Sequence, residues 1–313
     1  MLKSSILLIL FLSVFFSIVP ATAETTFSLD VLAASVSPRD MNIINVESIS
    51  SAEIRDIPFI PELIPMMTVK LTPGKKNVKP SAVFFEPSAG ITISPLGIDT
   101  SVQEILHITR YFTLTAAGNA DTCWNYGSMY TVAGVYDAAN RKYMASPSFG
   151  SALLKTRIEA AAMLPVHRFI FRVFYAPGFQ YNTAAENGEV WKFGFSSSNV
   201  NGWSYQYGGS VMYLFNSFIS YAGIQFSASG LYSWTSFDSR FDDYDPLFVT
   251  YSVTPVMKMT LTQKQSLTFA FPIVRERKFS TSDYDSSETL FQTRTGTTWR
   301  LKALTCVYHL QLN

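Results

Sequence analysis

The sequence predicts an all-β protein, namely an antiparallel transmembrane β-barrel of about 12 strands preceded by an N-terminal signal peptide. Three observations predict this fold. The first residues have the pattern of an export signal, and later stretches alternate apolar and polar residues over unusual lengths. In addition, no apolar run after residue 23 reaches the length of about 20 residues that a transmembrane helix needs. A chain of this kind that crosses a membrane must cross it with strands.

The export signal occupies residues 1–23. Lys3 precedes apolar residues from Ile6 to Ile18, and Pro20 and the small residues 21–23 follow them. This order predicts a signal peptide that is cut after Ala23 and leaves residues 24–313 as the mature barrel. The apolar run is short for a membrane span and Glu24, not a cysteine, follows the cut, so we expect neither an anchor helix nor lipidation.

Charge and cysteine content exclude several classes of protein. The chain has 24 basic and 23 acidic residues, and removal of Lys3 with the signal peptide balances them. This balance gives no reason to expect nucleic acid or acidic substrates as partners. Two cysteines, Cys123 and Cys306, are too few for a disulfide scaffold in an exported protein, although one bridge between them stays an alternative to two isolated thiols.

The strongest strand pattern lies between Leu247 and Thr262, where apolar and polar residues alternate strictly. A globular strand has about 5 or 6 residues, whereas a tilted membrane strand has about 9 to 11. The stretches 222–234, 267–273 and 304–312 alternate in the same way. We expect their apolar side to face lipid, the alternative being the core of a soluble secreted β-sandwich. The candidate lipid-facing residues are Val249, Tyr251, Val253, Leu267, Phe269, Phe271, Leu304, Tyr308 and Leu310.

The first part of the mature chain differs in composition from the rest. Every Tyr and Trp lies at or after Tyr111, and residues 57–65 contain clustered prolines. Residues 24–105 are therefore either a partly periplasmic segment or the first barrel strands joined by a long irregular connection. The second interpretation is favoured because 25–37 and 81–94 still have strand patterns.

Aromatic residues and loop lengths agree with an outer-membrane barrel. Tyr232 and Trp234 end one apolar face and Trp299 precedes the last strand, positions suited to rings at the level of the lipid headgroups. The connections 236–246 and 275–298 are long and polar, whereas 262–266 is short. Such barrels have long loops outside and short turns in the periplasm, so we expect an outer-membrane location.

Twelve strands are predicted, with ten and fourteen as alternatives, because an even number places both termini in the periplasm. The segment 67–71 could add another strand, and the count places the short link 164–168 outside, against the usual habit of tight turns. The predicted strands are 25–37, 81–94, 104–118, 128–137, 150–163, 167–180, 188–196, 202–214, 219–235, 246–262, 265–277 and 299–312.

Four stretches, GNADTCWNYG at 118–127, NGEVWKFGFSSSNVNGWSYQYGG at 187–209, MTLTQKQSLTFAFPIVRER at 259–277 and WRLKALTCVYHL at 299–310, carry a family resemblance. They resemble poorly characterised outer-membrane β-barrel proteins of treponemes and related spirochaetes. The resemblance covers mainly residues 81–313 and implies the fold and the location, with no catalytic residue. The chain ends in Leu312 and Asn313, whereas the last residue of barrels recognised by the insertion machinery is commonly aromatic.

The sequence contains no signature of catalysis, of a cofactor or of a metal site. Its three histidines have no metal-ligand spacing, and phosphate-binding and nucleophile-elbow motifs are absent. His309 beside a serine would suit a lipid-hydrolysing barrel, but a lone polar residue on an inward face is usually structural. The acidic loop with Asp238, Asp242, Asp243 and Asp245 lacks the ordered spacing of a calcium loop.

The inward faces suggest a function. Lys155, Arg157, Glu159 and Lys258 are the candidate lumen-lining residues, with Arg168, Arg172 and Lys192 as further inward candidates. We expect a non-enzymatic barrel that is a small pore or a structural, surface-exposed protein, with an adhesin-type interaction barrel as the alternative. The expected partners are outer-membrane lipid, the barrel-insertion machinery and either small solutes or host surface ligands.

Overall fold

The computed structural model describes residues 23–36, 62–73, 83–124, 133–140, 142–193, 196–279, 290 and 293–312. The predicted signal peptide, apart from Ala23, lies outside these residues. The first strand, β1 (Ala23–Val36), begins at the residue after which the cut is predicted. A cut at that position would leave the strand intact from Glu24 onward.

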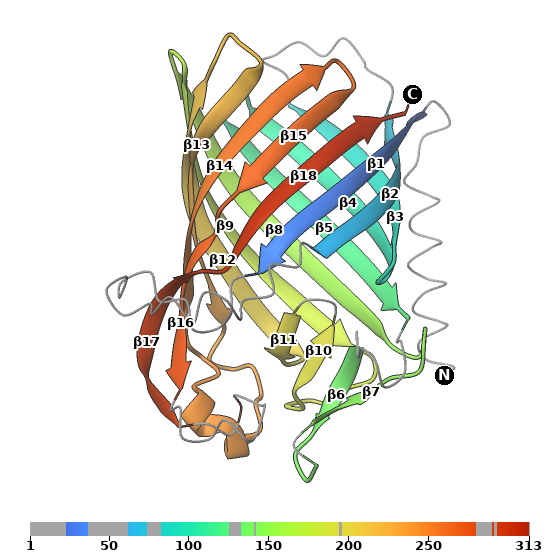
Figure 1. Cartoon of the computed structure of the whole chain (residues 1–313), viewed down its shortest axis with the longest axis vertical. Helices are drawn as coiled ribbons and strands as arrows, with labels where there is room; N and C mark the ends of the chain where they lie inside the picture. The colour runs from blue at the N-terminus through green and yellow to red at the C-terminus, as the bar shows by residue number, and fades with distance from the viewer. Residues whose placement is uncertain are drawn as a thin grey trace, which may run out of the picture.

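Twelve antiparallel strands form one closed barrel (Figure 1). In the order in which they pair, the strands are β1, β2 (Glu62–Pro73), β3 (Phe84–Ser94), β4 (Gly97–Thr109), β5 (Phe112–Cys123), β8 (Ala152–Val166), β9 (Phe169–Asn182), β12 (Gly202–Leu214), β13 (Ile219–Leu231), β14 (Thr250–Thr262), β15 (Gln265–Ala270) and β18 (Ala303–Gln311). The pairing of β18 with β1 joins the two ends of the chain. Closure leaves no sheet edge for the bilayer to solvate.

The two ends of the barrel differ. One end, the turn end, carries both strand termini, Ala23 and Gln311, and the short turns at 110–111, 167–168, 215–218 and 263–264. The other end, the cap end, carries the long connections with their own secondary structure. The short link 164–168 thus lies at the turn end together with 263–264, and the prediction that placed it at the opposite end is wrong.

The count of twelve is right, although three of the predicted strands are wrong. The predicted strand 104–118 is divided by a turn at Arg110 and Tyr111 into β4 and β5. The predicted strands 128–137 and 188–196 are represented by β6 (Ala133–Asp137) and β10 (Trp191–Phe193), which lie outside the barrel. The residues 62–73, of which only 67–71 had been noted, form the barrel strand β2.

A cap covers part of one end of the barrel. It consists of a four-stranded sheet in the order β11 (Ser196–Asn199), β10, β6 and β7 (Lys142–Ala145), together with the 3-10 helix η2 (Ser239–Tyr244). A bridge between Gly188 and Phe237 connects the segment before β10 to the segment before η2. Two further strands, β16 (Ile273–Phe279) and β17 (Arg294–Leu301), continue β15 and β18 beyond the wall and pair with each other (Figure 1).

The register fixes which residues share a face of the wall, because directly opposed residues in neighbouring strands point to the same side. Val253 is opposite Phe226, and Tyr308 is opposite both Leu267 and Val31, all on the outer side. The outer side also carries the other predicted lipid-facing residues of the barrel strands: Tyr251, Phe269, Leu304 and Leu310. Val249 and Phe271 lie just outside the bounds of β14 and β15.

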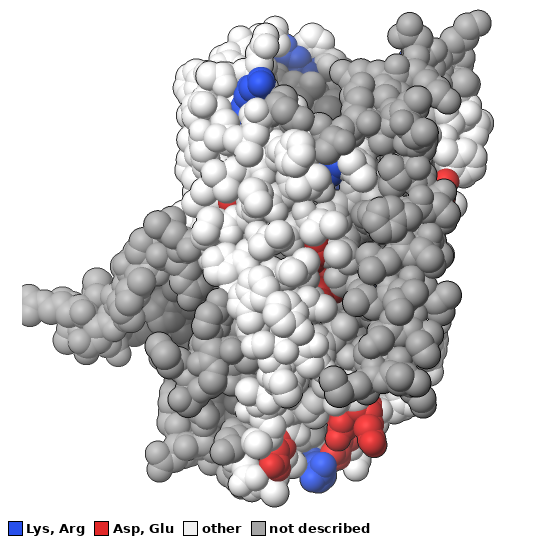
Figure 2. Space-filling model, turned by 90° about the vertical axis from the view of Figure 1, so that its right-hand side faces the viewer, with Lys and Arg blue, Asp and Glu red and all other residues white. Residues whose placement is uncertain are grey.

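The outer side is mainly apolar and almost free of charge on the described barrel strands. On the described barrel strands, Glu104 is the only acidic or basic residue with outward parity, between Pro87 on β3 and Ala116 on β5. Among the described residues, no helix is long and apolar enough to cross a membrane. On the face shown in Figure 2, charged side chains gather mainly towards the two ends, and the described atoms between them are predominantly uncharged.

Aromatic side chains gather on the outer side near the cap end. The hydroxyls of Tyr175 and Tyr232 are 2.5 Å apart, and the rings of Tyr232 and Trp234 stack with centroids 4.3 Å apart. Trp203 packs edge-on against Phe179. Rings with one apolar and one polar edge suit the boundary between hydrocarbon and headgroups.

Candidate functional site

The lumen has two chemically different sectors. From β1 through β9 the inward positions carry charged residues: Asp30, Lys70, Glu86, Asp99, Asp121, Lys155, Arg157, Glu159 and Arg172. On β12 and β13 and the first half of β14 they carry mainly neutral polar residues: Ser204, Gln206, Ser210, Gln225, Ser227, Ser229, Thr250, Ser252 and Thr254. We call the second sector the neutral wall. Because its hydroxyl side chains are short, the neutral wall leaves space in the lumen and presents a polar surface to that space.

Glu159 organises the charged sector. It is buried, and its carboxylate pairs with Arg172 through one oxygen and lies 3.5 Å from Arg157 Nη2 through the other. Arg172 in turn covers the ring of Phe174 at 4.7 Å. Two guanidinium groups thus share one carboxylate, which leaves a surplus positive charge on the lumen wall.

A second charged group lies nearer the cap. Lys155 Nζ is 3.4 Å from Asp121 Oδ2, and Asn119 donates a hydrogen bond of 3.2 Å to Asp99. Asp99 and Asp121 are directly opposed in register. Lys155 is therefore matched by an acidic neighbour, unlike the shared charge of Arg157.

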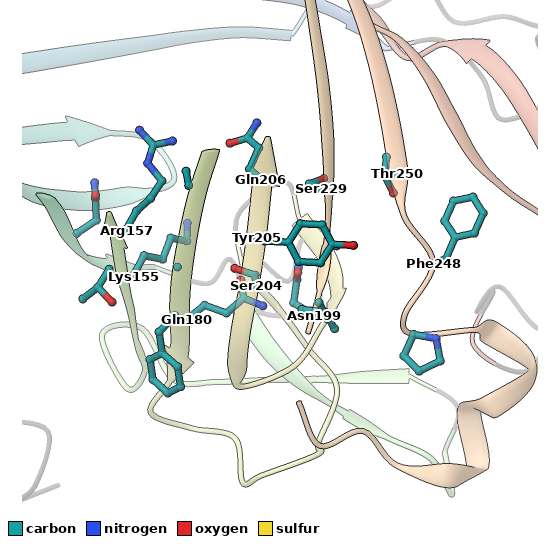
Figure 3. Close-up of a pocket in the computed structure, with 18 of the residues that line it drawn as sticks. Lys155, Arg157, Gln180, Asn199, Ser204, Tyr205, Gln206, Ser229, Phe248 and Thr250 are labelled. Atoms are coloured by element: carbon teal, nitrogen blue, oxygen red, sulfur yellow. The ribbon is translucent and has the colours of Figure 1, made fainter. Parts of the chain in front are cut away.

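A cavity of about 920 Å³ lies where the lumen meets the cap (Figure 3). Lys155 and Arg157 lie on one side of it, Thr250 and Phe248 on the other, and Ser204, Gln206 and Ser229 between them. Asn199, Tyr244, Pro246 and Arg277 contribute from the cap end. Within the described part of the chain, the lining residues include three cationic side chains and no Asp or Glu.

The hydrogen bonds that hold Arg277 go to a backbone carbonyl and not to a carboxylate. Its Nε and Nη2 donate to the backbone oxygen of Asp245 at 3.1 and 2.8 Å, and its guanidinium lies 4.0 Å from the centroid of the Tyr244 ring. The carboxylate of Asp245 pairs instead with Arg294. Burial lowers the pKa of Arg277, although an arginine remains charged under such conditions.

The guanidinium groups of three arginines lie close to the ring of Phe248. Arg275, Arg277 and Arg294 lie 5.3, 5.0 and 4.9 Å from the centroid of its ring. Guanidinium groups stack favourably on aromatic faces and keep their edges available for anions. The cap end of the cavity therefore has a concentrated positive charge.

The cap is a packed body rather than a loose loop. One cluster contains Cys123, Leu153 and Trp191, and a second contains Tyr136, Val200 and Phe241. Asn201, only 4% exposed, accepts hydrogen bonds from the Asn182 amide and Trp191 Nε1 and donates to the backbone oxygens of Asn182 and Ala185. This fully used amide joins the end of β9 to the cap.

Several predicted lumen residues lie elsewhere. Lys258 has inward parity but lies towards the turn end, opposite Tyr221 and Thr268, far along the strand from Thr250 at the cavity. Arg168 is in the turn between β8 and β9, and Lys192 is in the cap strand β10 over the ring of Tyr143 at 5.3 Å. The proposals of Arg168 and Lys192 as wall-lining residues are therefore wrong, because the segments that carry them are a turn and a cap strand.

His309 lies between an acidic and a hydroxyl side chain on the neighbouring strands. His309 Nδ1 is 2.6 Å from Asp30 Oδ1, and Ser266 is opposite His309 in register. Productive acyl transfer also needs donors for an oxyanion, and the backbone around Ser266 pairs with β14 and β18. His107 likewise contacts an acidic side chain, because its Nε2 lies 3.0 Å from the Glu86 carboxylate.

Two acidic residues of the loop, Asp238 and Asp245, have structural roles. Asp238 caps η2 by accepting from the Arg240 amide, and the Arg240 guanidinium holds the pKa of Asp238 below its usual value. Asp245 has a left-handed backbone, with φ of 55°, and binds the two arginines described above. Among the described residues, no group of three or more His, Cys, Asp or Glu side chains could hold a metal ion.

The sequence did not reveal Arg277, Asp245 and Phe248 as parts of one site. Their pairing depends on how the segment after β13 folds against β16, which no local pattern specifies. The one signal in the sequence is the recurrence of arginine at positions 275, 277 and 294.

Comparisons with known proteins found similar solved barrels but no sequence relative. No protein-family model and no curated protein sequence matches the chain. The NanC porin matches with a TM-score of 0.43 and 9% identity, covering 91% of this chain and 99% of that one. An outer membrane channel from Pseudomonas putida F1 matches with a TM-score of 0.46 and 12% identity, covering 94% and 96%. The function is therefore argued from this chain's own residues.

Proposed function

We propose that the mature chain is a passive outer-membrane pore for small polar solutes. The single observation that carries this proposal is the contrast between the two sides of the wall. The outer side has one acidic or basic residue on the described barrel strands, whereas the inner side has a charged sector facing a neutral hydroxyl-rich wall. A membrane barrel with a polar interior has this contrast, and the short side chains on one sector of the inner side favour an open lumen over a filled one.

The neutral wall supports a water-filled path. Ser204, Ser227 and Ser229 line it with short side chains next to the 920 Å³ cavity. Charged groups on the facing sector are held in pairs, such as Glu159 with Arg172, so they need not collapse across the lumen. A polar solute can then exchange its hydration for hydroxyl groups on one side and fixed charges on the other.

The proposal includes export and assembly steps. A signal peptide cut after Ala23 would release the chain into the periplasm, where the insertion machinery would place it in outer-membrane lipid with the turn end inside and the cap end outside. That orientation agrees with the position of both strand termini and of four short turns at the turn end, while one short turn, 95–96, lies at the cap end.

Conductance in planar lipid bilayers tests the pore. Purified mature chain, refolded in detergent, should add stepwise current increments in 1 M KCl, and the refolded state should shift on an unheated gel. A preparation that shows the gel shift and never conducts would contradict the proposal. A preparation that lacks the gel shift is misfolded, so only preparations that show the shift are used to measure the current.

An adhesin-type surface protein is the second candidate, and the cap favours it. The cap has its own buried clusters and the Asn201 hydrogen bonds, so it offers an ordered surface at the end predicted to lie outside. Binding of whole cells expressing the chain to immobilised host matrix proteins, lost when the cap is replaced by short turns while the barrel still folds, would support this role. The geometry around Ser266 and His309 gives no support for catalysis.

A further inference from the structure

We infer that the cavity beneath the cap is a binding site for small hydroxylated organic anions, with Arg157 and Arg277 as the cationic groups that attract their carboxylate. This inference rests on the proposed pore and specifies the kind of solute that the pore would take up. It concerns the cap end of the lumen only, and Lys258 has no part in it.

The electrostatic argument starts from the charges that line the cavity. Among the residues that the structure describes, Lys155, Arg157 and Arg277 line it and no Asp or Glu does. Lys155 is matched by Asp121 at 3.4 Å, so the surplus belongs to the two arginines. Arg157 shares Glu159 with Arg172, and Arg277 is bonded to a neutral carbonyl.

The orientation of Arg277 makes it a prepared donor. Two of its nitrogens are fixed by the Asp245 carbonyl, and the flat face of the guanidinium rests on Tyr244. Among the described residues, the N–H groups on Nη1 have no hydrogen-bond acceptor, so they are available to a ligand. A guanidinium whose position is already fixed loses little side-chain entropy when it binds an anion.

The neutral side chains on the other side of the cavity determine which further functional groups the bound solute should carry. Ser204, Ser229 and Thr250 present hydroxyl groups, and Gln206 presents an amide. These groups donate and accept hydrogen bonds, as a solute with several hydroxyls requires. Chloride would use the arginines alone, and a neutral polyol would use the hydroxyls alone, so a hydroxylated carboxylate should bind more tightly than either.

The cavity is large enough for such a solute. Its volume of about 920 Å³ lies near the upper end of ordinary ligand pockets, which span roughly 300 to 1,000 Å³. Water can therefore remain beside a bound ligand, and binding should be weak enough for release into the lumen. Because the charges are partly solvated, added salt should weaken the binding.

The test measures binding and conduction separately. Gluconate is the probe, sorbitol is its neutral analogue, and calorimetry on the refolded mature chain in detergent gives the affinities at low salt. We expect gluconate to bind and sorbitol to bind at least about tenfold more weakly, the scale of one hydrogen bond to a charged group. Current in KCl, recorded on the same preparation, reports on the pore independently of the binding site.

Two variants and one control locate the site. Arg157→Gln and Arg277→Gln should each weaken gluconate binding about tenfold, whereas Lys258→Gln should leave it unchanged. Arg157 has no bond to the cap, so its variant remains informative if Arg277→Gln loosens the cap. Equal affinity for gluconate and sorbitol, or equal loss in all three variants, would overturn the inference while leaving the pore intact. Binding with the expected pattern in a barrel that never conducts would support the site and overturn the pore.

Discussion

His309 Nδ1 lies 2.6 Å from Asp30 Oδ1, a contact that links the last strand of the barrel to the first. Both side chains point into the lumen and are partly exposed, so the pair should contribute a modest amount, about 1 kcal/mol. A double-mutant cycle with Asp30→Asn and His309→Gln should show coupling of that size in urea unfolding followed by tryptophan fluorescence. If the two changes were simply additive, the contact would have no energetic role in closing the barrel.

Orientation can be measured with single cysteines in a Cys123→Ser, Cys306→Ser background. Ser239 lies in η2 at the cap end and Gln263 in the turn at the other end. An impermeant maleimide on intact cells should label a cysteine at 239 and leave one at 263 unlabelled until the cells are opened. Ser286, in the long connection 275–298, lies outside the described residues. Equal labelling of both positions would contradict the orientation.

The two sides of β14 should respond differently to arginine. Val253 is on the outer side opposite Phe226, and Ser252 is on the inner side opposite Ser227. Val253→Arg should reduce the free energy of folding into bilayers by about 2 to 4 kcal/mol, the cost of a basic side chain near the bilayer midplane. Ser252→Arg should have a much smaller effect, and the reverse order would mean that the faces are misassigned.

Glu104 is a carboxyl group among apolar neighbours on the outer side, so its removal should stabilise the barrel. Glu104→Leu should increase the free energy of unfolding in bilayers by about 1 kcal/mol, because an acidic side chain on the lipid face is destabilising, though less so than a basic one. Glu86→Leu is the matched control, since Glu86 points inward and pairs with His107. That change should destabilise, and a stabilising effect of both would indicate a general gain from hydrophobicity.

Asn201 should be necessary for the cap and not for the barrel. Asn201→Leu leaves the Trp191 indole N–H and the Asn182 amide without their acceptor in a buried place, at a cost of about 1 to 3 kcal/mol for each unpaired group. Limited proteolysis should then cut between 183 and 201, while the heat-dependent gel shift of the barrel persists. A cap that stays resistant would show that the apolar clusters alone hold it.

The sequence predicted well which residues of the barrel strands face outward and which face inward. It did so because lipid and water impose opposite requirements on alternate residues. It failed at the turn between β4 and β5, where neither Gly nor Pro is present. There the Thr109 hydroxyl accepts hydrogen bonds from the amides of Tyr111 and Phe112, so a side chain makes the turn and the strand pattern continues through it.

Two other errors have related causes. Residues 133–137 and 191–193 have the alternation of strands, and a local pattern does not reveal that their partners are in the cap. Pro65 made β2 look irregular. It lies opposite Val31 on β1, but the register with β3 begins only at Met67, so the proline is on an edge that is locally unpaired.

The cavity site could be predicted only in part. Lys155 and Arg157 follow from the parity of one long strand, so the sequence identified them. Arg277 reaches the cavity from β16 through its bonds to Asp245, a contact between residues 32 positions apart that depends on the fold of the cap end. Charge counts alone could not distinguish Lys155, which pairs with Asp121, from Arg157, which shares Glu159 with Arg172.

The pairing of β1 with β18 has a kinetic consequence. These strands lie at opposite ends of the chain, and their contact joins residues separated by 279 positions. The wall therefore remains open during folding until β18 pairs with β1, and each of these strands has an unpaired edge up to that step. Contacts of such long sequence separation form slowly, and open edges can pair with other chains in the meantime. Loss of the last nine residues of the sheet, Ala303–Gln311, would make that vulnerable state permanent.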